Sequence, residues 1–317
     1  MFSILSHRRI EIVRRLRRTL AVCLGVAFAA NACGAPSAEH RQSAALHSSA
    51  FIDDFGDTLR LARPAERIVS LNPVTTEALF AIGAGARLVG RTHWDGAPAA
   101  ARSVPDLGDG LKPNVEAVLA VRPDLVVLYA ADANRGAASS FHRAGVPTLT
   151  VRTDRLADFA RVLRALGGAT GDSAAAAIVA DSVQRSLDAV RAMPAPAVPM
   201  TVFWHAWDAP VITIGAGSYL DELVVIAGAR NVFADLPQPS PQVTLESVAQ
   251  RNPGFVLAGP QAARKILADP RWLAVPAVRA RRVLVVDTAL VGRPGVRMGE
   301  AAKSLRLLFD SATRGRR

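Results

Sequence analysis

Short β-branched runs alternate with helical stretches along most of the chain. Helices are expected at 75–82 and 115–121, and a hairpin with residues 53–57 on its turn side precedes the series. Such alternation predicts mostly parallel sheets covered by helices, arranged most simply as two α/β lobes. The expected strands form two groups, which are 67–71, 88–90, 125–129 and 148–151, and then 201–204, 211–214, 255–258 and 283–286.

A single long helix is expected between the two groups of strands. Asp172 is a suitable N-cap for a helix that begins at Ser173 and ends at Ala192, before prolines at 194, 196 and 199. About twenty helical residues span roughly 30 Å, enough to connect two lobes. One rigid helix permits little movement, so we expect a cleft that changes little on ligand binding. The apolar positions recur at helical spacing on one face, at Val179, Val183, Leu187 and Val190.

One pattern occurs twice, once in each group of strands. In the first copy Glu116 opens a short helix, and Pro123 follows seven residues later, just before a hydrophobic strand. In the second copy Glu246 and Pro253 have the same spacing and context. The helix dipole alone accounts for either glutamate, because it favours an acid in the first turn. Their equivalent placement also predicts pseudo-duplicated lobes that present two carboxylates to a partner with two identical subunits, each offering an arginine.

The net charge changes this picture little. It is +11 over 317 residues, but the first 32 residues contribute +5, from six arginines and one glutamate, which leaves +6 for the rest. The remaining basic residues are spread along the chain rather than gathered in a stripe, so no nucleic-acid partner is expected. Half of the residues are hydrophobic, which predicts a packed globular core rather than disorder.

The N-terminus has the three parts of an export signal: an arginine-rich start, an apolar run at 20–30, and small residues before Cys33. The apolar run is too short for a stable membrane span. The segment 30–34 is either a lipobox, in which Cys33 is acylated, or a cleavage site for ordinary secretion, and we expect the lipoprotein form. Cys23 leaves with the signal, so no internal disulfide is expected in the mature chain.

These features divide the chain into five parts. A stretch rich in Ala, Ser and Gln follows the signal and is expected to be a flexible tether. The expected parts are a signal peptide at 1–32, the tether at 33–50, an N-terminal α/β lobe at 51–168, a connecting helix at 169–194 and a C-terminal α/β lobe at 195–317.

Each lobe carries a histidine close to a tryptophan just after an expected strand. The pairs are His93 with Trp94, and His205 with Trp207. Because the carboxyl ends of parallel strands line clefts, these side chains are candidates for a ligand site. A metal chelate accepts an imidazole as an axial ligand, whereas a bare metal ion requires at least three donors. The alternative is that the histidines are hydrogen-bonded at strand ends and that the tryptophans are packing residues.

Catalytic signatures are absent from the sequence. It contains no Gly-x-Ser-x-Gly elbow, no glycine-rich phosphate loop with lysine, no His-Glu-x-x-His and no paired cysteine ligands. The glycines at 83 and 85 lie between a helix and a strand, whereas a nucleotide fingerprint lies between a strand and a helix. No cofactor is expected, and an exported enzyme on an α/β scaffold is the less favoured alternative.

Several segments, taken in order, resemble the iron-complex and vitamin B12 family of periplasmic solute-binding proteins, the helical-backbone metal receptors of ABC importers. The resemblance covers about residues 53–310. It implies two pseudo-symmetric α/β lobes joined by one long connecting helix. It also implies that Glu116 and Glu246 dock onto arginines of a permease dimer, which works with an ATPase. The segments that carry it are 67–73 with Thr76-Glu77, 83–85, 123–126 and 241–246.

The resemblance further implies that a metal chelate, such as cobalamin, a ferric siderophore or haem, binds in a cleft between the lobes. Trp94 falls where a relative that binds vitamin B12 has an aromatic contact, but two other tryptophans of that relative are replaced here, by Gly110 or Leu111 and by Ser240. An arginine in the cleft suits amide, phosphate, carboxylate or catecholate oxygens. The alternative ligand is free zinc or manganese. Other positions that correspond to the cleft of relatives are Trp207, Ile212, Arg293 and Arg297.

Overall fold

The computed structural model describes residues 50–194 and 200–314. In the N-terminal half a parallel four-stranded sheet has the strand order β4-β3-β5-β6. Its central strands are almost entirely buried, which explains why their sequences are continuous apolar runs rather than alternating ones. All four strands lie within one residue of their predicted ends, at Ile68–Leu71 (β3), Leu88–Gly90 (β4), Leu125–Tyr129 (β5) and Thr148–Val151 (β6).

The predicted hairpin precedes this sheet, with β1 at Phe51–Ile52 and β2 at Thr58–Leu59. Its turn is tied to the sheet by the buried carboxylate of Asp53. One oxygen of this carboxylate accepts amide hydrogen bonds within the turn, and the other accepts one from the amide of Thr150 at 3.0 Å.

The C-terminal half contains a second parallel four-stranded sheet, with the order β10-β9-β7-β8. The strand predicted at 211–214 is wrong. Ile212 makes only isolated antiparallel bridges to Trp207 and Gln242, because its segment turns back onto the residues that follow β7 instead of entering the sheet. The strand at the edge next to β7 is instead the short β8. The bounds are Met200–Trp204 (β7), Ala229–Asn231 (β8), Phe255–Ala258 (β9) and Val283–Val285 (β10).

The helices are Pro73–Ala81 (α2), Val115–Ala120 (α3), Arg135–Arg143 (α4), Leu156–Thr170 (α5), Ser173–Arg191 (α6), Tyr219–Ile226 (α7), Leu245–Arg251 (α8), Pro260–Ala268 (α9), Pro276–Arg279 (α10), Thr288–Val291 (α11) and Met298–Arg314 (α12). Short 3-10 helices lie at Gly85–Arg87 (η1), Ala99–Ser103 (η2), Asp132–Asn134 (η3) and Pro270–Ala274 (η4).

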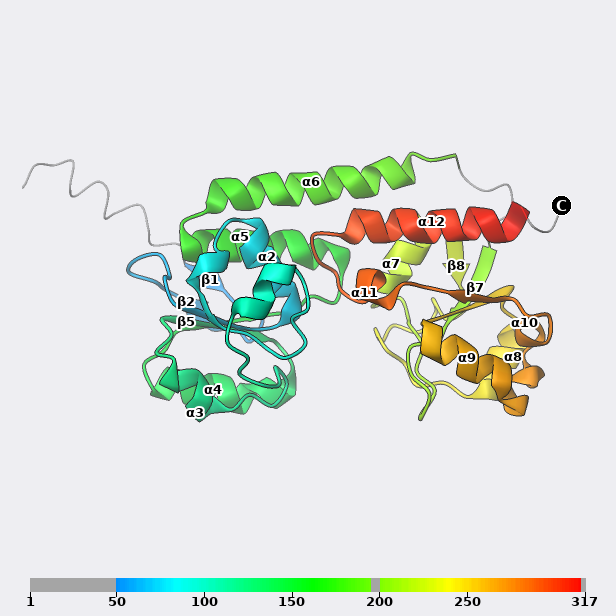
Figure 1. The fold of residues 1–317 in the computed structure, drawn as a ribbon, viewed down its shortest axis with the longest axis horizontal. Coiled ribbons are helices and arrows are strands. Elements are labelled where there is room, and N and C mark those ends of the chain that lie inside the picture. Colours follow the sequence, from blue (N-terminus) through cyan, green and yellow to red (C-terminus); the bar gives the residue numbers. More distant parts are fainter. Residues whose placement is uncertain (1–49, 195–199, 315–317) are drawn as a thin grey trace, which may run out of the picture. The chain divides into compact units, whose positions relative to one another are not determined.

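The two lobes are layered alike (Figure 1). One face of each sheet packs into a shared hydrophobic cluster to which α2, α5, α6, α7 and α12 contribute. The other face packs into a separate cluster in each lobe, formed with α3 and α4 in the N-terminal lobe and with α8, α9 and α10 in the C-terminal lobe. The predicted pseudo-symmetric pair of α/β lobes is therefore confirmed.

The predicted connecting helix is α6. Three of the four apolar positions that predicted it, Val183, Leu187 and Val190, are buried. Asp172 precedes the helix as predicted, but its side chain makes no cap hydrogen bond. It lies instead 3.4 Å from the guanidinium group of Arg87, so the predicted capping contact is wrong.

The helix α12, which the sequence did not predict, runs alongside α6 (Figure 1). The two helices approach closely at Gly299, where a Cβ atom would lie 1.9 Å from Oγ of Ser186. Nearer its N-terminus α6 packs against α5, and Gly167 meets Ala176 in the same manner. Helix α6 is thus held by a helix from each lobe.

No helix within the described residues is long and apolar enough to cross a membrane. The proposed signal peptide at 1–32, with Cys33 and the tether up to residue 49, lies outside the described part of the chain. The predicted boundaries of the lobes and of the linker at 169–194 stay predictions.

Candidate ligand site and docking face

The two copies of the repeated pattern start with the same helix cap. Before α3, the side-chain oxygen of Asn114 accepts a hydrogen bond from the amide of Ala117 at 3.0 Å. Before α8, the hydroxyl of Thr244 accepts one from the amide of Ser247 at 3.2 Å. Each cap satisfies an amide that the first helical turn leaves free. The two helices therefore begin in equivalent geometry.

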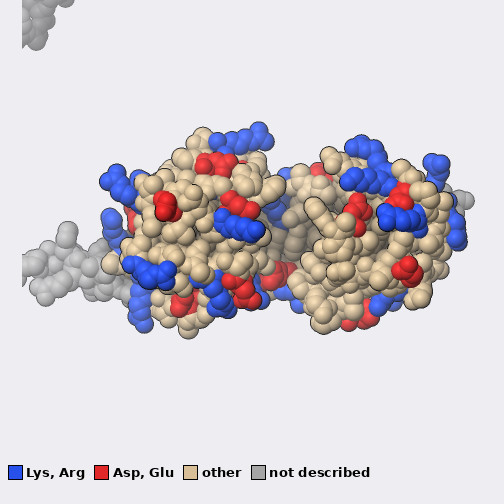
Figure 2. Space-filling model, turned by 90° about the horizontal axis from the view of Figure 1, so that it is seen from below, with Lys and Arg blue, Asp and Glu red and all other residues tan. Residues whose placement is uncertain are grey.

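Glu116 and Glu246 follow these caps by two residues, and both are exposed. Neither forms an ion pair with any residue in the described part of the chain. Six residues after each glutamate the backbone turns through positive φ, at 48° in Arg122 and 44° in Asn252, before the proline that leads into the next strand. Both glutamates belong to helices that cover the sheet face opposite α6. Seen from below, the surface carries interspersed acidic and basic groups on both lobes (Figure 2).

His93 and Trp94 lie in the loop after β4. Both side chains are exposed, Trp94 by 60%, and the centroids of their rings are 4.5 Å apart. The buried carboxylate of Asp95 anchors this loop by accepting hydrogen bonds from the amide and hydroxyl of Thr92, each at 3.0 Å, and from the hydroxyl of Thr76 at 2.9 Å. Burial raises the pKa of Asp95, although these hydrogen bonds oppose the shift. The two rings are therefore presented to solvent by an anchored loop.

His205 follows β7 but is buried, with 4% of its surface exposed. Its Nε2 lies 2.9 Å from Oδ1 of Asp208, and its ring packs edge-on against Trp272 at 5.5 Å. Its Nδ1 has no hydrogen-bond partner among the described residues. No described contact joins His205 to His93. This placement matches the alternative considered above, a histidine hydrogen-bonded at a strand end.

Trp207, by contrast, is 63% exposed. It pairs with the half-buried Ile212, whose amide donates to the carbonyl oxygen of Trp207 at 3.0 Å. This short antiparallel bridge holds the tryptophan at the carboxyl edge of the second sheet, just as the loop after β4 holds Trp94 at the edge of the first. Figure 2 shows the surface hollowed between the two lobes.

Arg293 and Arg297 lie between α11 and α12. The Arg293 side chain donates a hydrogen bond to the carbonyl oxygen of Trp94 at 2.5 Å, across the lobes. Arg297 donates two hydrogen bonds of 2.8 Å to Glu300, which occupies much of its guanidinium group. The nearby carboxylate of Glu77 on α2 is 8% exposed, and burial raises its pKa while the charges of both arginines oppose the shift. The structure thus brings Arg293 and Trp94 together, whereas Arg297 is paired with Glu300.

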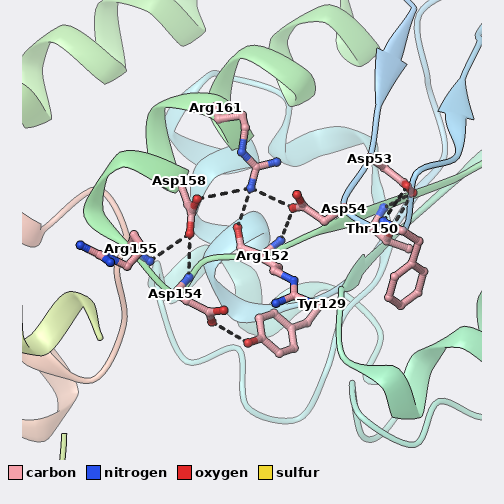
Figure 3. Close-up of polar contacts among 10 residues, drawn as sticks. Asp53, Asp54, Tyr129, Thr150, Arg152, Asp154, Arg155, Asp158 and Arg161 are labelled. Carbon is pink, nitrogen blue, oxygen red and sulfur yellow. Dashed lines mark hydrogen bonds and ion pairs between the residues drawn. The ribbon is translucent and has the colours of Figure 1, made fainter. Parts of the chain in front are cut away.

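Tyr129 was not predicted as a site residue, yet it ends the central strand β5 at the same sheet edge. Its hydroxyl donates to Asp154 at 2.6 Å (Figure 3). Burial and this hydrogen bond raise the pKa of Tyr129, so the phenol is protonated at neutral pH. The signal in the sequence was an aromatic residue at the end of a buried run, where a parallel sheet places binding groups.

A second set of contacts joins the lobes beside Tyr129. Glu222 on α7 accepts hydrogen bonds from the side chain of Arg155 and, at 3.1 Å, from the amide of Leu156. The amide of Tyr219 donates to the carbonyl oxygen of Asp154 at 2.7 Å. The turn between β6 and α5 is therefore bound to the C-terminal lobe.

No three His, Cys, Asp or Glu side chains in the described ranges are grouped as ligands for a metal ion. A receptor for free zinc or manganese requires at least three such donors.

A sequence profile described as periplasmic binding protein matches residues 68–290. The chain belongs to the periplasmic binding protein family. This binding protein is 26% identical over 243 residues to the vitamin B12-binding protein of Vibrio cholerae serotype O1. The matched region covers 76% of this chain and 88% of that one. It is 27% identical over 285 residues to the ABC transporter substrate-binding lipoprotein YvrC of Bacillus subtilis, with 86% and 90% covered. Its fold matches the periplasmic haem-binding protein RhuT of Roseiflexus sp. RS-1 with a TM-score of 0.70 at 25% identity, covering 78% of this chain and 99% of that chain.

Membership of this family establishes the general function. The binding protein is the substrate-binding component of an ABC transporter, related to vitamin B12-binding and haem-binding proteins, and it is not an enzyme. Its partner is therefore a permease. The family and the fold inferred from the sequence motifs are both confirmed.

Proposed function

We propose that this binding protein captures a metal chelate (cobalamin, a ferric siderophore or haem) between its lobes and delivers it to a permease dimer. The observation that carries the proposal is the pair of largely exposed tryptophans, Trp94 and Trp207, one at the carboxyl edge of each sheet. A large aromatic ring contributes much of the apolar contact area in a binding site, and its flat face suits a flat macrocycle or catechol ring. The vitamin B12-binding and haem-binding relatives support the ligand class.

Three other residues complete the proposed ligand site. His93 lies against Trp94 and offers an imidazole nitrogen to the metal or to a polar group of the ligand. Ile212 supports Trp207 through the antiparallel bridge. Arg293 offers donors to ligand oxygens from beside Trp94, whereas Arg297, held by Glu300, has a lesser role. His205 is assigned to the interior of the C-terminal lobe.

The proposed docking groups are Glu116 and Glu246. Their identical caps, their exposure and their lack of ion pairs among the described residues leave both carboxylates available to arginines of a permease. The proposed attachment is a lipid on Cys33, supported by the lipoprotein relative from Bacillus subtilis.

Tryptophan fluorescence of the purified mature chain tests the proposal. Titration with cyanocobalamin, haemin and a ferric hydroxamate is expected to show saturable quenching by one of them, because these coloured chelates would lie within contact of Trp94 and Trp207. Zinc and manganese chlorides serve as the comparison and are expected to leave the emission unchanged. Quenching by none of the three chelates, or saturable binding of a free ion, would overturn the proposed ligand class.

A further inference from the structure

The helix α2 carries two adjacent buried residues, Thr76 and Glu77, that the ligand site and the docking face do not use directly. The Thr76 hydroxyl donates to the carboxylate of Asp95, which in turn accepts the amide and hydroxyl of Thr92. This chain of hydrogen bonds fixes the loop that carries Trp94. Thr76 therefore acts on the N-terminal half of the ligand site.

Glu77 contacts the C-terminal half of the proposed ligand site, because its carboxylate extends into the C-terminal lobe. Its Oε2 lies 2.8 Å from the position that a Cβ atom of Gly295 would occupy, and the amide of Val296 hydrogen-bonds to it. Gly295 does not have a positive φ, so its backbone conformation does not call for glycine, but an added Cβ there would have to displace the Glu77 carboxylate. The positive charge of Arg293 lies near the same carboxylate.

Arg293 joins the two halves. Its hydrogen bond to the carbonyl oxygen of Trp94 connects the segment that Glu77 holds with the loop that Thr76 holds. Arg293 makes no direct ion pair with a carboxylate in the described ranges, but the carboxylates of Glu77 and Asp95 both lie near enough for its charge to act on them. Its hydrogen bond to the backbone of Trp94 therefore fixes it beside this loop.

Glu222 makes a similar interlobe contact, but it extends from the C-terminal lobe to the N-terminal lobe. It extends from α7 of the C-terminal lobe and accepts a backbone amide, that of Leu156, and an arginine side chain, that of Arg155, from the N-terminal lobe. The neighbouring carbonyl oxygen of Asp154 accepts the amide of Tyr219, while its carboxylate holds the hydroxyl of Tyr129. Each lobe thus extends one glutamate to the other lobe. Glu222 contacts an arginine and a backbone amide, whereas Glu77 lies against Gly295 and the amide of Val296, with two arginine charges nearby.

Burying a carboxylate costs stability unless it is fully compensated. Burial raises the pKa of Glu77, and the charges of Arg293 and Arg297 only partly oppose the shift. Replacing a buried charged group by an apolar side chain of similar volume is often neutral or stabilising. The contact of Glu77 with the segment at Gly295 therefore suggests a positioning role.

We propose that Glu77 and Glu222 are reciprocal interlobe clasps that position side chains in and next to the proposed ligand site. Glu77 holds the segment around Gly295, which places Arg293 beside Trp94, and Glu222 holds the turn that places Asp154 against Tyr129. The assignment of these side chains to the ligand rests on the proposed function. The clasps themselves are contacts within the chain and are tested without a ligand.

Amide hydrogen exchange of the mature chain tests the clasps directly. Glu77→Ala is expected to speed exchange in segment 292–297 about tenfold, and to leave segment 152–158 within about twofold of wild type, because the loss of one charge-assisted hydrogen bond corresponds to roughly that factor. Glu222→Ala is expected to show the reverse pattern. Glu77→Gln keeps an acceptor for Val296 and should restore most of the protection in 292–297.

Gly295→Ala provides a second route, since its methyl group displaces the Glu77 carboxylate without removing it. Gly96→Ala is the matched control, because a Cβ at Gly96 meets nothing within 4 Å. Faster exchange in 292–297 is expected for Gly295→Ala alone. Wild-type exchange in Glu77→Ala and Gly295→Ala, or an equal rise in both segments for either glutamate variant, would overturn the clasps.

The same variants are then titrated with cyanocobalamin and haemin. With the chelate that binds the wild type, Glu77→Ala is expected to weaken binding about tenfold while the free energy of unfolding does not fall. Unchanged binding together with faster exchange would refute the positioning role. Failure of both chelates to bind the wild type would count against the proposed ligand, and the exchange pattern would still decide whether the clasps exist.

Discussion

The proposed docking helices and the proposed ligand loops of this binding protein are duplicated to different degrees. In α3 and α8 the cap, the exposed glutamate and the positive-φ residue recur at the same spacing with the same burial. In the loops after β4 and β7 only the residue types recur. His93 is exposed against Trp94, whereas His205 is buried against Trp272.

This difference fits the partners proposed for the two faces. A permease made of two identical subunits would offer the same surface twice, so equivalent carboxylates on the two lobes would fit it. A small ligand between the lobes would present different groups to each of them. The loops proposed to contact it would then need exposed aromatic rings in both lobes but not the same histidine geometry.

Removal of both proposed docking glutamates should have the strongest effect, on the affinity for the permease. Replacing Glu116 and Glu246 together by alanine should weaken binding to the reconstituted permease about a hundredfold, and each single change about tenfold, because each removes one charged contact from the interface. Chelate affinity should not change. The measurement is the dissociation constant for the permease in lipid nanodiscs.

Asp181→Ala is the control for these variants, since Asp181 is exposed on α6, away from both docking helices. It should bind the permease like the wild type. Single variants with very unequal losses would show that the two helices are not equivalent, and an unaffected double variant would refute the docking assignment.

The two histidines provide the next comparison. His205→Ala should lower the free energy of unfolding by about 1–3 kcal/mol, because it opens a space beside Trp272 and removes the hydrogen bond to Asp208. His93→Ala should change it by less than about 0.5 kcal/mol, as expected for an exposed side chain. Urea unfolding measures both values. Equal effects would contradict the different burial of the two residues.

A smaller effect concerns the buried acids beneath the Trp94 loop. Burial raises the pKa values of Glu77 and Asp95 above their ordinary values near 4. The folded state therefore binds these protons more tightly than the unfolded state does, so their contribution to the free energy of unfolding declines as the pH rises through the raised pKa values. Glu77→Gln should flatten this decline between pH 4 and pH 7, because the amide does not titrate. An unchanged or steeper slope in urea titrations would contradict this.

Most of the fold could be predicted from the sequence, because buried parallel strands have continuous apolar sequences. The strand at 211–214 could not be excluded by this rule, since its apolar residues pack in a local bridge that only the tertiary fold reveals. The strand β8, Ala229–Asn231, is short and partly polar, so nothing in its composition marks it. Helix α12 has buried residues at helical spacing, at Met298, Ala301, Leu305 and Phe309, which a closer search of the C-terminus would have found.

The candidate site was less predictable. The sequence places Trp94 and Trp207 at strand ends, but it does not show that His205 turns inward, because the partner that buries it, Trp272, is far along the chain. Tyr129 was not predicted as a site residue, because in the sequence it is indistinguishable from the last residue of a core strand. The interlobe contacts of Glu77 join segments that only the fold brings together, and Thr76-Glu77 had no role in the sequence beyond marking the family.

A single ligand is proposed to contact both lobes, and variants of the two tryptophans test whether it does. With the chelate that quenches the wild type, Trp94→Phe and Trp207→Phe are each expected to lose part of the quenching and to weaken binding by about tenfold, at a stoichiometry of one ligand per chain. Quenching that depends on only one of the two tryptophans would contradict the claim, because it would place the ligand on a single lobe.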